Sequence, residues 1–149
     1  MSLIEETAAG LDGLAQLRKL IASGRKPGIL VSLDFEFIEV EAGRAVFAGI
    51  PGDHAYNPIG TVHGGYAATL LDSACGCSVH SCLTATQAYT TLELKVAYHK
   101  ALTRDSGFLR AEGRVLSIGR RAAFAEATLK DASGRLFASA TSTLLVMER

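Results

Sequence analysis

A single acidic residue lies in a long uncharged segment of the chain. From Gly64 to Val79, Asp72 is the only residue that is charged at neutral pH, and small and aliphatic residues would surround it on every side of a helix. Burial of a carboxylate is costly and disfavours its ionised form, which suits a group that accepts a proton. Asp72 is therefore the first candidate for chemistry. The alternative is a buried acid that hydrogen bonds to neighbouring hydroxyls such as Thr69 or Ser73.

A pair of glycines begins the same segment. Gly64 and Gly65 follow His63 directly. Glycines at the start of a helix leave the first N–H groups accessible, and the positive end of the helix dipole can stabilise a developing oxyanion. His63 either orients this turn, which we favour, or transfers a proton itself.

Other reactive side chains nearby do not converge. Cys75, Cys77, His80 and Cys82 are of the types that bind zinc, but on a helix the first and last share one face while the other two fall on the opposite face. We therefore expect no metal site. Three cysteines within one short segment do not fit a secreted disulfide pattern, so a reducing cytoplasm is favoured.

The composition predicts one compact domain over residues 1–149. Of the 149 residues, 48% are hydrophobic and 20% charged, with a formal net charge of zero, which indicates neither disorder nor a nucleic-acid-binding surface. The first residues lack the features of a signal peptide, and no apolar run approaches the roughly 20 residues of a membrane span. We expect a cytoplasmic protein that binds neither nucleic acid nor membranes.

The hydrophobic pattern predicts helices first and strands later. Leu11, Leu14, Leu17 and Ile21 recur at helical spacing, which predicts an N-terminal helical segment over residues 1–28. The uncharged segment predicts a helix that is buried all round. Alternating or β-branched runs predict strands at residues 29–40, 43–50, 91–98, 108–118, 122–130 and 136–147.

The strand over residues 91–98 has a strict period of two. Leu92, Leu94, Val96 and Tyr98 are expected to face the core, and Thr91 to lie on the polar face. Short connections favour antiparallel neighbours, and the apolar helix would cover one face of the sheet. The predicted fold is α+β, a curled antiparallel sheet wrapped around a central buried helix, with an N-terminal helix.

Four motifs together resemble the PaaI-type branch of the hotdog-fold acyl-CoA thioesterases. They are Asn57-Pro58, the His63-Gly64-Gly65 triplet, Asp72 nine positions after His63, and the strand that begins at Thr91; the resemblance runs from about residue 35 to the C-terminus. One departure is Lys100-Ala101, where many relatives have Arg-Pro.

The resemblance implies a hotdog core over residues 29–149 and hydrolysis of small acyl- or aryl-acyl-CoA thioesters. It implies Asp72 as general base or nucleophile and the Gly64 N–H as the group that polarises the thioester carbonyl, with Asn57 as a further site residue. Thr91 is either a site residue or an ordinary strand residue. No cofactor is implied, because coenzyme A is part of the substrate. Hydration or dehydration of an acyl thioester and non-catalytic acyl-CoA binding remain alternatives.

Substrate binding can be assigned to a further set of residues. Gly65 allows the substrate to approach the helix start. Arg120 and Arg121 follow Gly119 at a strand end, and arginine binds phosphates such as those of coenzyme A. Ordinary solvated surface is the alternative for the two arginines.

Spacing along the helix argues for a dimer. Asp72 lies seven residues after Gly65, or roughly 10 Å along the axis, whereas reacting groups must approach within about 3 Å. An antiparallel copy of the helix would bring the two groups together at two equivalent sites. The expectation is a homodimer with shared active sites, alone or within a tetramer.

Overall fold

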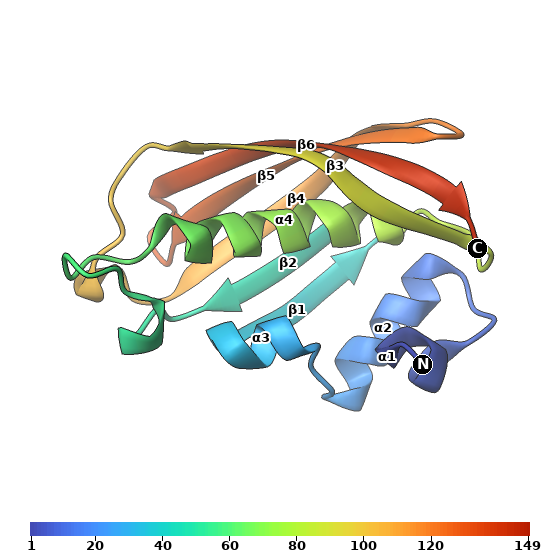
Figure 1. The fold of residues 1–149 in the computed structure, drawn as a ribbon, viewed down its shortest axis with the longest axis horizontal. Coiled ribbons are helices and arrows are strands. Elements are labelled where there is room, and N and C mark those ends of the chain that lie inside the picture. Colours follow the sequence, from blue (N-terminus) through green and yellow to red (C-terminus); the bar gives the residue numbers. More distant parts are fainter.

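The computed structural model describes all 149 residues, which form one six-stranded sheet and four α-helices. The sheet curls over the longest helix, and the three N-terminal helices gather on its open side (Figure 1). The elements are α1 (Leu3–Ala8), α2 (Gly13–Ser23), α3 (Gly28–Leu33), β1 (Phe35–Glu41), β2 (Arg44–Gly49), α4 (Gly64–His80), β3 (Gln87–Tyr98), β4 (Leu109–Ile118), β5 (Ala122–Asp131) and β6 (Leu136–Glu148).

The sheet is antiparallel throughout, with the strand order β1-β2-β4-β5-β6-β3. Consecutive strands β4, β5 and β6 are neighbours, as their short connections predict. Strand β3 instead pairs with the C-terminal strand β6 and forms one edge of the sheet. The strand that follows the central helix is therefore left with one unpaired side.

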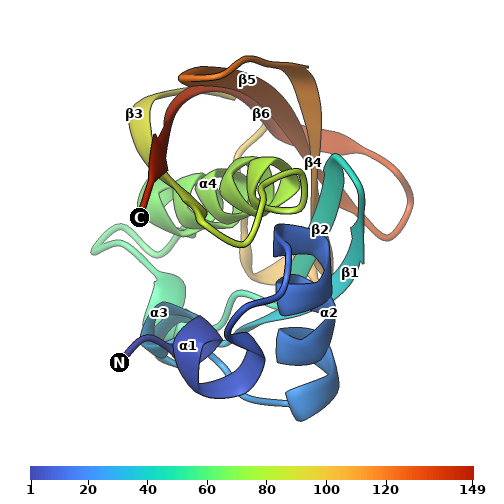
Figure 2. The same cartoon turned by 90° about the vertical axis from the view of Figure 1, so that its right-hand side faces the viewer.

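Small residues allow the sheet to wrap closely around α4 (Figure 2). A Cβ atom on Gly113 of β4 would lie 2.2 Å from the Ala74 carbonyl oxygen, so only glycine permits this approach. Leu70 and Leu71 of α4 are fully buried against the sheet. The inner face of the sheet presents buried alanines at positions 111, 123, 125, 127, 138 and 140.

The N-terminal segment is longer and more helical than the sequence indicates. Residues 29–33, expected to begin the first strand, form α3, and β1 begins only at Phe35. Asp34 ends α3 in the left-handed conformation with φ of 52°. The β-branched residues Ile29 and Val31 are 52% and 64% exposed, whereas Leu30 is 4% exposed. Tertiary burial of one side of this turn overrides the local strand preference.

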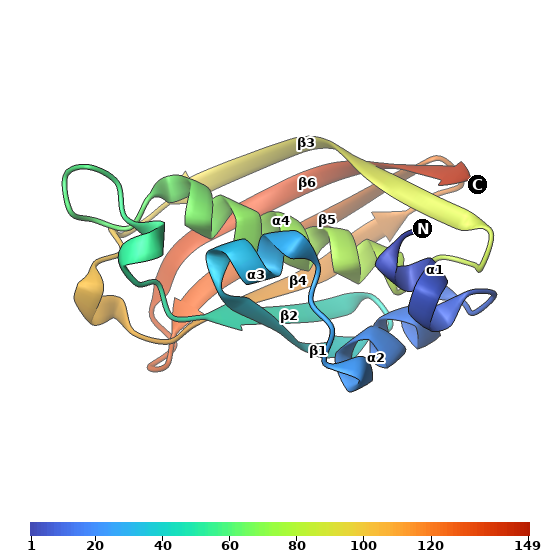
Figure 3. The same ribbon diagram turned by 60° about the horizontal axis from the view of Figure 1, so that its bottom comes forward.

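Helix α4 is not buried on all sides, contrary to the expectation. Thr69, Asp72, Ser73 and Cys77 form a half-buried stripe, because they recur at spacings of three and four residues. Three of these residues, Asp72, Ser73 and Cys77, line a cavity together with residues of α3, which crosses in front of α4 in Figure 3. The sheet thus covers most of the helix and leaves open the side that carries the acid.

A β-bulge changes which residues of β3 face the helix. The pairing of β3 with β6 shifts between Thr91 and Glu93. Because one extra residue reverses the alternation, Thr91 lies on the helix side together with Leu94 and Tyr98, while Leu92 is 62% exposed. The expected core position of Leu92 and polar-face position of Thr91 are therefore both wrong.

None of the helices combines the length and the apolar character that a membrane span requires.

Candidate active site

Asp72 is held between the central helix and the edge strand. It lies in the middle of α4 and is half-buried. The Thr91 hydroxyl of β3 donates a hydrogen bond of 3.1 Å to one of its carboxylate oxygens, Oδ1. Neither Thr69 nor Ser73 donates to the carboxylate: the Thr69 hydroxyl donates to the Gly65 carbonyl within the helix. The second oxygen, Oδ2, is therefore available to another group.

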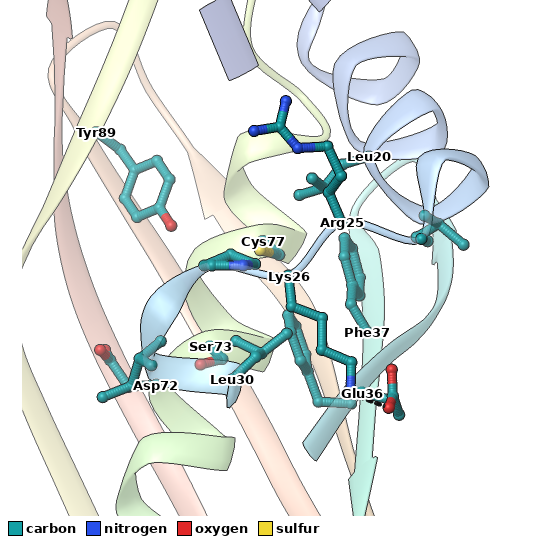
Figure 4. Close-up of a pocket in the computed structure, with 15 residues that line it drawn as sticks. Leu20, Arg25, Lys26, Leu30, Glu36, Phe37, Asp72, Ser73, Cys77 and Tyr89 are labelled. Atoms are coloured by element: carbon teal, nitrogen blue, oxygen red, sulfur yellow. Dashed lines mark hydrogen bonds and ion pairs between the residues drawn. The ribbon is translucent and has the colours of Figure 1, made fainter. Parts of the chain in front are cut away.

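A cavity of about 220 Å³ opens beside Asp72 (Figure 4). One wall is formed by Asp72, Ser73 and Cys77 of α4, and the side chain of Tyr89 reaches into the cavity from β3. The stacked rings of Phe37 and Phe47, with centroids 4.4 Å apart, form the opposite wall. The α2–α3 segment covers the top, with Leu20, Ile21, Ile29 and Leu30 among its lining residues.

The interior of this cavity holds a single unpaired charge. Lys26 forms an ion pair with Glu36 at the rim, and Arg25 pairs with Glu6 at 2.7 Å. Burial raises the pKa of the Cys77 thiol to about 12, so this thiol stays protonated and is a poor nucleophile. Asp72 is thus the group in the cavity best suited to accept a proton or to attack an electrophile.

The start of α4 forms a second, distinct site. His63 caps the helix: its Nδ1 accepts a hydrogen bond of 2.8 Å from the Gly65 N–H, and its carbonyl accepts from the Tyr66 N–H. The Gly64 N–H has no acceptor within the chain and lies at the positive end of the helix dipole. It borders a second cavity of about 200 Å³, which also contacts Tyr98 and Lys100.

The two sites do not meet within one chain. Asp72 is eight residues after Gly64, which corresponds to about 12 Å along the helix axis. The two residues line different cavities. The acid and the free N–H therefore cannot contact the same carbonyl group unless another chain supplies one of them.

Asn57 lies in the loop before α4 and uses its side chain to close that loop. Its Oδ1 accepts hydrogen bonds from the N–H groups of Ile59 and Thr61, and its Nδ2 donates to the Thr61 hydroxyl at 2.8 Å. The loop is further closed where the Asn57 N–H donates to the Thr61 carbonyl. In this chain Asn57 shapes the segment that delivers His63 to the helix start.

Arg120 and Arg121 lie far from the helix start of their own chain. Both are exposed in the turn between β4 and β5. The Arg121 carbonyl accepts from Val146, which pairs with Tyr89 of β3, whereas Gly64 contacts Tyr98. Tyr89 and Tyr98 are nine residues apart on β3, which corresponds to about 30 Å. The arginines line neither cavity described above.

Several residues of these sites were missed from the sequence. Tyr98 was assigned to the core, yet its hydroxyl contacts Gly64. Tyr89, Phe37 and Phe47 read as ordinary strand residues, and only their position opposite α4 brings them to the cavity. The helical spacing of the leucines predicted α2, and the structure places the α2–α3 segment over the cavity.

A family model described as the thioesterase superfamily matches residues 59–138. The chain belongs to this superfamily. The matched region includes the His63-Gly64-Gly65 turn, Asp72 and the whole of β3, whereas Phe37, Phe47 and the α2–α3 segment of the cavity lie before it. A comparison with curated proteins finds no match.

Solved structures of thioesterases have the same fold. A thioesterase family protein from Silicibacter pomeroyi is 24% identical, with a TM-score of 0.79 over 89% of this chain and 98% of that one. A thioesterase from Haemophilus influenzae is 17% identical, with a TM-score of 0.78 over 89% and 90%. A Streptococcus mutans protein bound to acetyl-CoA is 27% identical, with a TM-score of 0.69 over 77% and 90%. The predicted α+β hotdog fold is confirmed.

Proposed function

We propose that this member of the thioesterase superfamily hydrolyses small acyl- or aryl-acyl-CoA thioesters to the free acid and coenzyme A, as its resemblance to the PaaI-type branch implies. The observation that carries the proposal is that one helix holds two complementary groups at separate positions. They are a half-buried carboxylate, Asp72, and a backbone donor without an acceptor, the Gly64 N–H. Acetyl-CoA bound to the Streptococcus mutans relative supports a coenzyme A substrate. The reaction needs no cofactor, and a cytoplasmic location is part of the proposal.

The volume beside Asp72 favours a compact acyl group. At about 220 Å³, the cavity is smaller than the roughly 300–1,000 Å³ of typical pockets for drug-sized ligands. A cavity of about 150 Å³ lined by aliphatic and aromatic residues is enough to hold benzene. The space therefore suits a single ring or a short branched chain, and a long unbranched chain would project into solvent.

The proposed active site is shared between two copies of the chain. Strand β3 is a 12-residue sheet edge with one unpaired side, and such edges readily pair with another chain. Along the direction of β3, Thr91 lies beside Asp72 and Tyr98 lies beside Gly64, because a hydrogen bond joins each pair. Antiparallel pairing of two β3 strands with Thr91 opposite Tyr98 of the partner subunit would align Asp72 with the partner's Gly64.

This register has a definite centre. Because the bulge between Thr91 and Glu93 adds one residue, the two-fold axis would pass beside Lys95, which lies three strand positions from both Thr91 and Tyr98. Each dimer would then hold two identical sites, and further association into a tetramer would leave them unchanged. Across such an axis, Arg120 and Arg121 lie toward the partner's helix start, where they could contact the phosphates of the coenzyme.

In the proposed reaction the partner's Gly64 N–H donates a hydrogen bond to the oxygen of the thioester carbonyl. Asp72 takes a proton from water while the water oxygen attacks the carbonyl carbon, and the resulting oxyanion is stabilised by the same N–H. The intermediate collapses, the carbon–sulfur bond breaks, and the proton on Asp72 passes to the departing thiolate. In the nucleophilic variant Asp72 attacks the carbonyl carbon, the carbon–sulfur bond breaks and coenzyme A leaves as the thiolate, and water then hydrolyses the mixed anhydride to the free acid and Asp72.

A thiol-release assay tests the proposal directly. The protein is incubated with acyl-CoAs that carry short, medium-chain, long-chain and monocyclic aromatic groups, and free coenzyme A is measured with a thiol reagent. We expect turnover with short and aromatic substrates and little with long chains. Conversion of the acyl group without free thiol would indicate hydration or dehydration instead, and binding without turnover would indicate a non-catalytic acyl-CoA-binding protein; either result rejects the proposal.

A further inference from the structure

One peptide group at the start of α4 is hydrogen bonded at both ends. The Tyr98 hydroxyl donates to the Gly64 carbonyl at 2.6 Å, and the Gly65 N–H donates to His63 Nδ1 at 2.8 Å. The Gly64 carbonyl and the Gly65 N–H belong to the same peptide unit. The hydrogen bonds therefore run from the Tyr98 phenol through this peptide to the His63 imidazole, whose remaining proton is on Nε2.

The Tyr98 ring also lies directly against Gly64. A Cβ atom on Gly64 would lie 3.0 Å from the Tyr98 hydroxyl oxygen and 3.1 Å from its Cζ. Burial raises the pKa of Tyr98, so its hydroxyl stays protonated and remains a donor. The ring thus limits the lateral movement of Gly64, and the hydroxyl fixes the orientation of the following peptide.

A turn with two consecutive glycines needs such restraints. Glycine has the widest range of backbone conformations, so Gly64 and Gly65 alone would allow the helix start to vary. A hydrogen-bond donor accelerates a reaction when it is already aimed at the developing charge, and small misplacements are costly. The Gly64 N–H is the donor that precedes the restrained peptide.

We propose that Tyr98 is a positioning residue that, together with His63, clamps the Gly64–Gly65 peptide and thereby aims the Gly64 N–H at the substrate carbonyl. The assignment of the donor's role rests on the proposed function. The clamp itself is a property of the folded chain and can be tested without substrate. Tyr98 acts through Gly64 and contributes no proton to the reaction.

The substitution Tyr98→Phe removes the hydroxyl and keeps the ring. We expect kcat to fall about tenfold, a loss similar to that of one hydrogen bond, with KM within about twofold of the parent value. The matched control is Tyr56→Phe, because the Tyr56 ring packs over Arg104 and its hydroxyl makes no hydrogen bond within the chain. An unchanged kcat, or a raised KM with normal kcat, would overturn the positioning role.

Solvent exchange of the Gly65 amide, measured by NMR, reports the clamp without any turnover. Exchange should be about fivefold faster in Tyr98→Phe than in the parent, and unchanged in Tyr56→Phe. Equal rates in the parent and in Tyr98→Phe would overturn the clamp. Absence of thiol release by the parent protein would reject the proposed function alone, so the two failures are distinguishable.

A double variant tests whether the two ends act on one peptide. His63→Ala removes the acceptor of the Gly65 N–H, so each single variant releases one end of the same group. The loss of kcat in the double variant should then be clearly smaller than the product of the two single losses. Losses that multiply fully would mean that Tyr98 and His63 act independently and would overturn the shared clamp.

Discussion

The start and the middle of α4 present different chemical groups. At the start, an accessible backbone N–H is held by a loop on one side and an edge strand on the other, with Gly64 as the residue that leaves it free. In the middle, the side chain of Asp72 is half-buried in an apolar cavity and receives one hydrogen bond, from Thr91. We propose that the start of the helix supplies positive potential that stabilises charge and that its middle supplies a base.

The difference explains why each half is incomplete. A helix start must face outward to offer its N–H, whereas a carboxylate must be partly desolvated to be a useful base. One helix meets both demands only at separate positions, about 12 Å apart here. In the proposed dimer a two-fold axis would overcome this separation, because each chain would contribute the half that its partner lacks.

The largest effect is expected at the middle of the helix. Asp72→Asn preserves the shape but removes the base, so thioester hydrolysis should fall by a factor of about 10²–10⁴. The matched control is Asp53→Asn, since Asp53 is an exposed carboxylate paired only with Arg104 at 3.4 Å. Thiol release within tenfold of the parent rate in Asp72→Asn would remove Asp72 from the mechanism.

The helix start should give the next largest effect. Gly64→Pro deletes the N–H, and proline is well tolerated as the first residue of a helix, especially as His63 has the extended backbone that proline requires before it. We expect a loss of about 10²–10³ in kcat. Circular dichroism and size measurements verify the fold.

The variant Gly64→Ala distinguishes the effect of losing the N–H from the effect of adding side-chain bulk. It introduces a Cβ against Tyr98 as proline does, yet keeps the donor. Gly64→Ala should therefore retain much more activity than Gly64→Pro. If the two variants are equally impaired, crowding of Tyr98 explains the loss and the oxyanion role of the N–H is refuted.

Removal of the hydrogen bond that Thr91 donates to Asp72 should give the smallest effect. Thr91→Val keeps the shape of the side chain and removes the hydroxyl that donates to Asp72. A loss of about tenfold in kcat is expected, consistent with one hydrogen bond to a charged group. Thr91→Ser retains the donor and should stay close to the parent. Equal rates in Thr91→Val and the parent would show that Thr91 is an ordinary strand residue.

The two regions also differ in how well the sequence predicts them. The His63-Gly64-Gly65 turn and the position of Asp72 were found from local patterns, because glycines at a helix start and a lone acid in an apolar helix are rare combinations. Helix α4 was predicted from its uncharged, small and aliphatic composition, and strands β4, β5 and β6 from alternating or β-branched runs. These features depend on neighbours in the sequence.

The remaining features depend on contacts between distant residues. The bulge that turns Thr91 toward Asp72 is set by the pairing of β3 with β6, which the period of two could not reveal. Helix α3 forms because Leu30 is buried, although its β-branched neighbours favour a strand. The contact of Tyr98 with Gly64 joins positions 34 residues apart. Only the folded chain brings such pairs together.

The shared site is the central claim, and subunit mixing tests it most directly. Asp72→Asn and Gly64→Pro chains are mixed and allowed to exchange, with heterodimers confirmed by native mass spectrometry of mass-tagged chains. A shared site predicts that each heterodimer has one doubly impaired site and one intact site, so thiol release should rise to about a quarter of the parent rate per chain. Heterodimers that form but release thiol no faster than the two separate variants would contradict the claim.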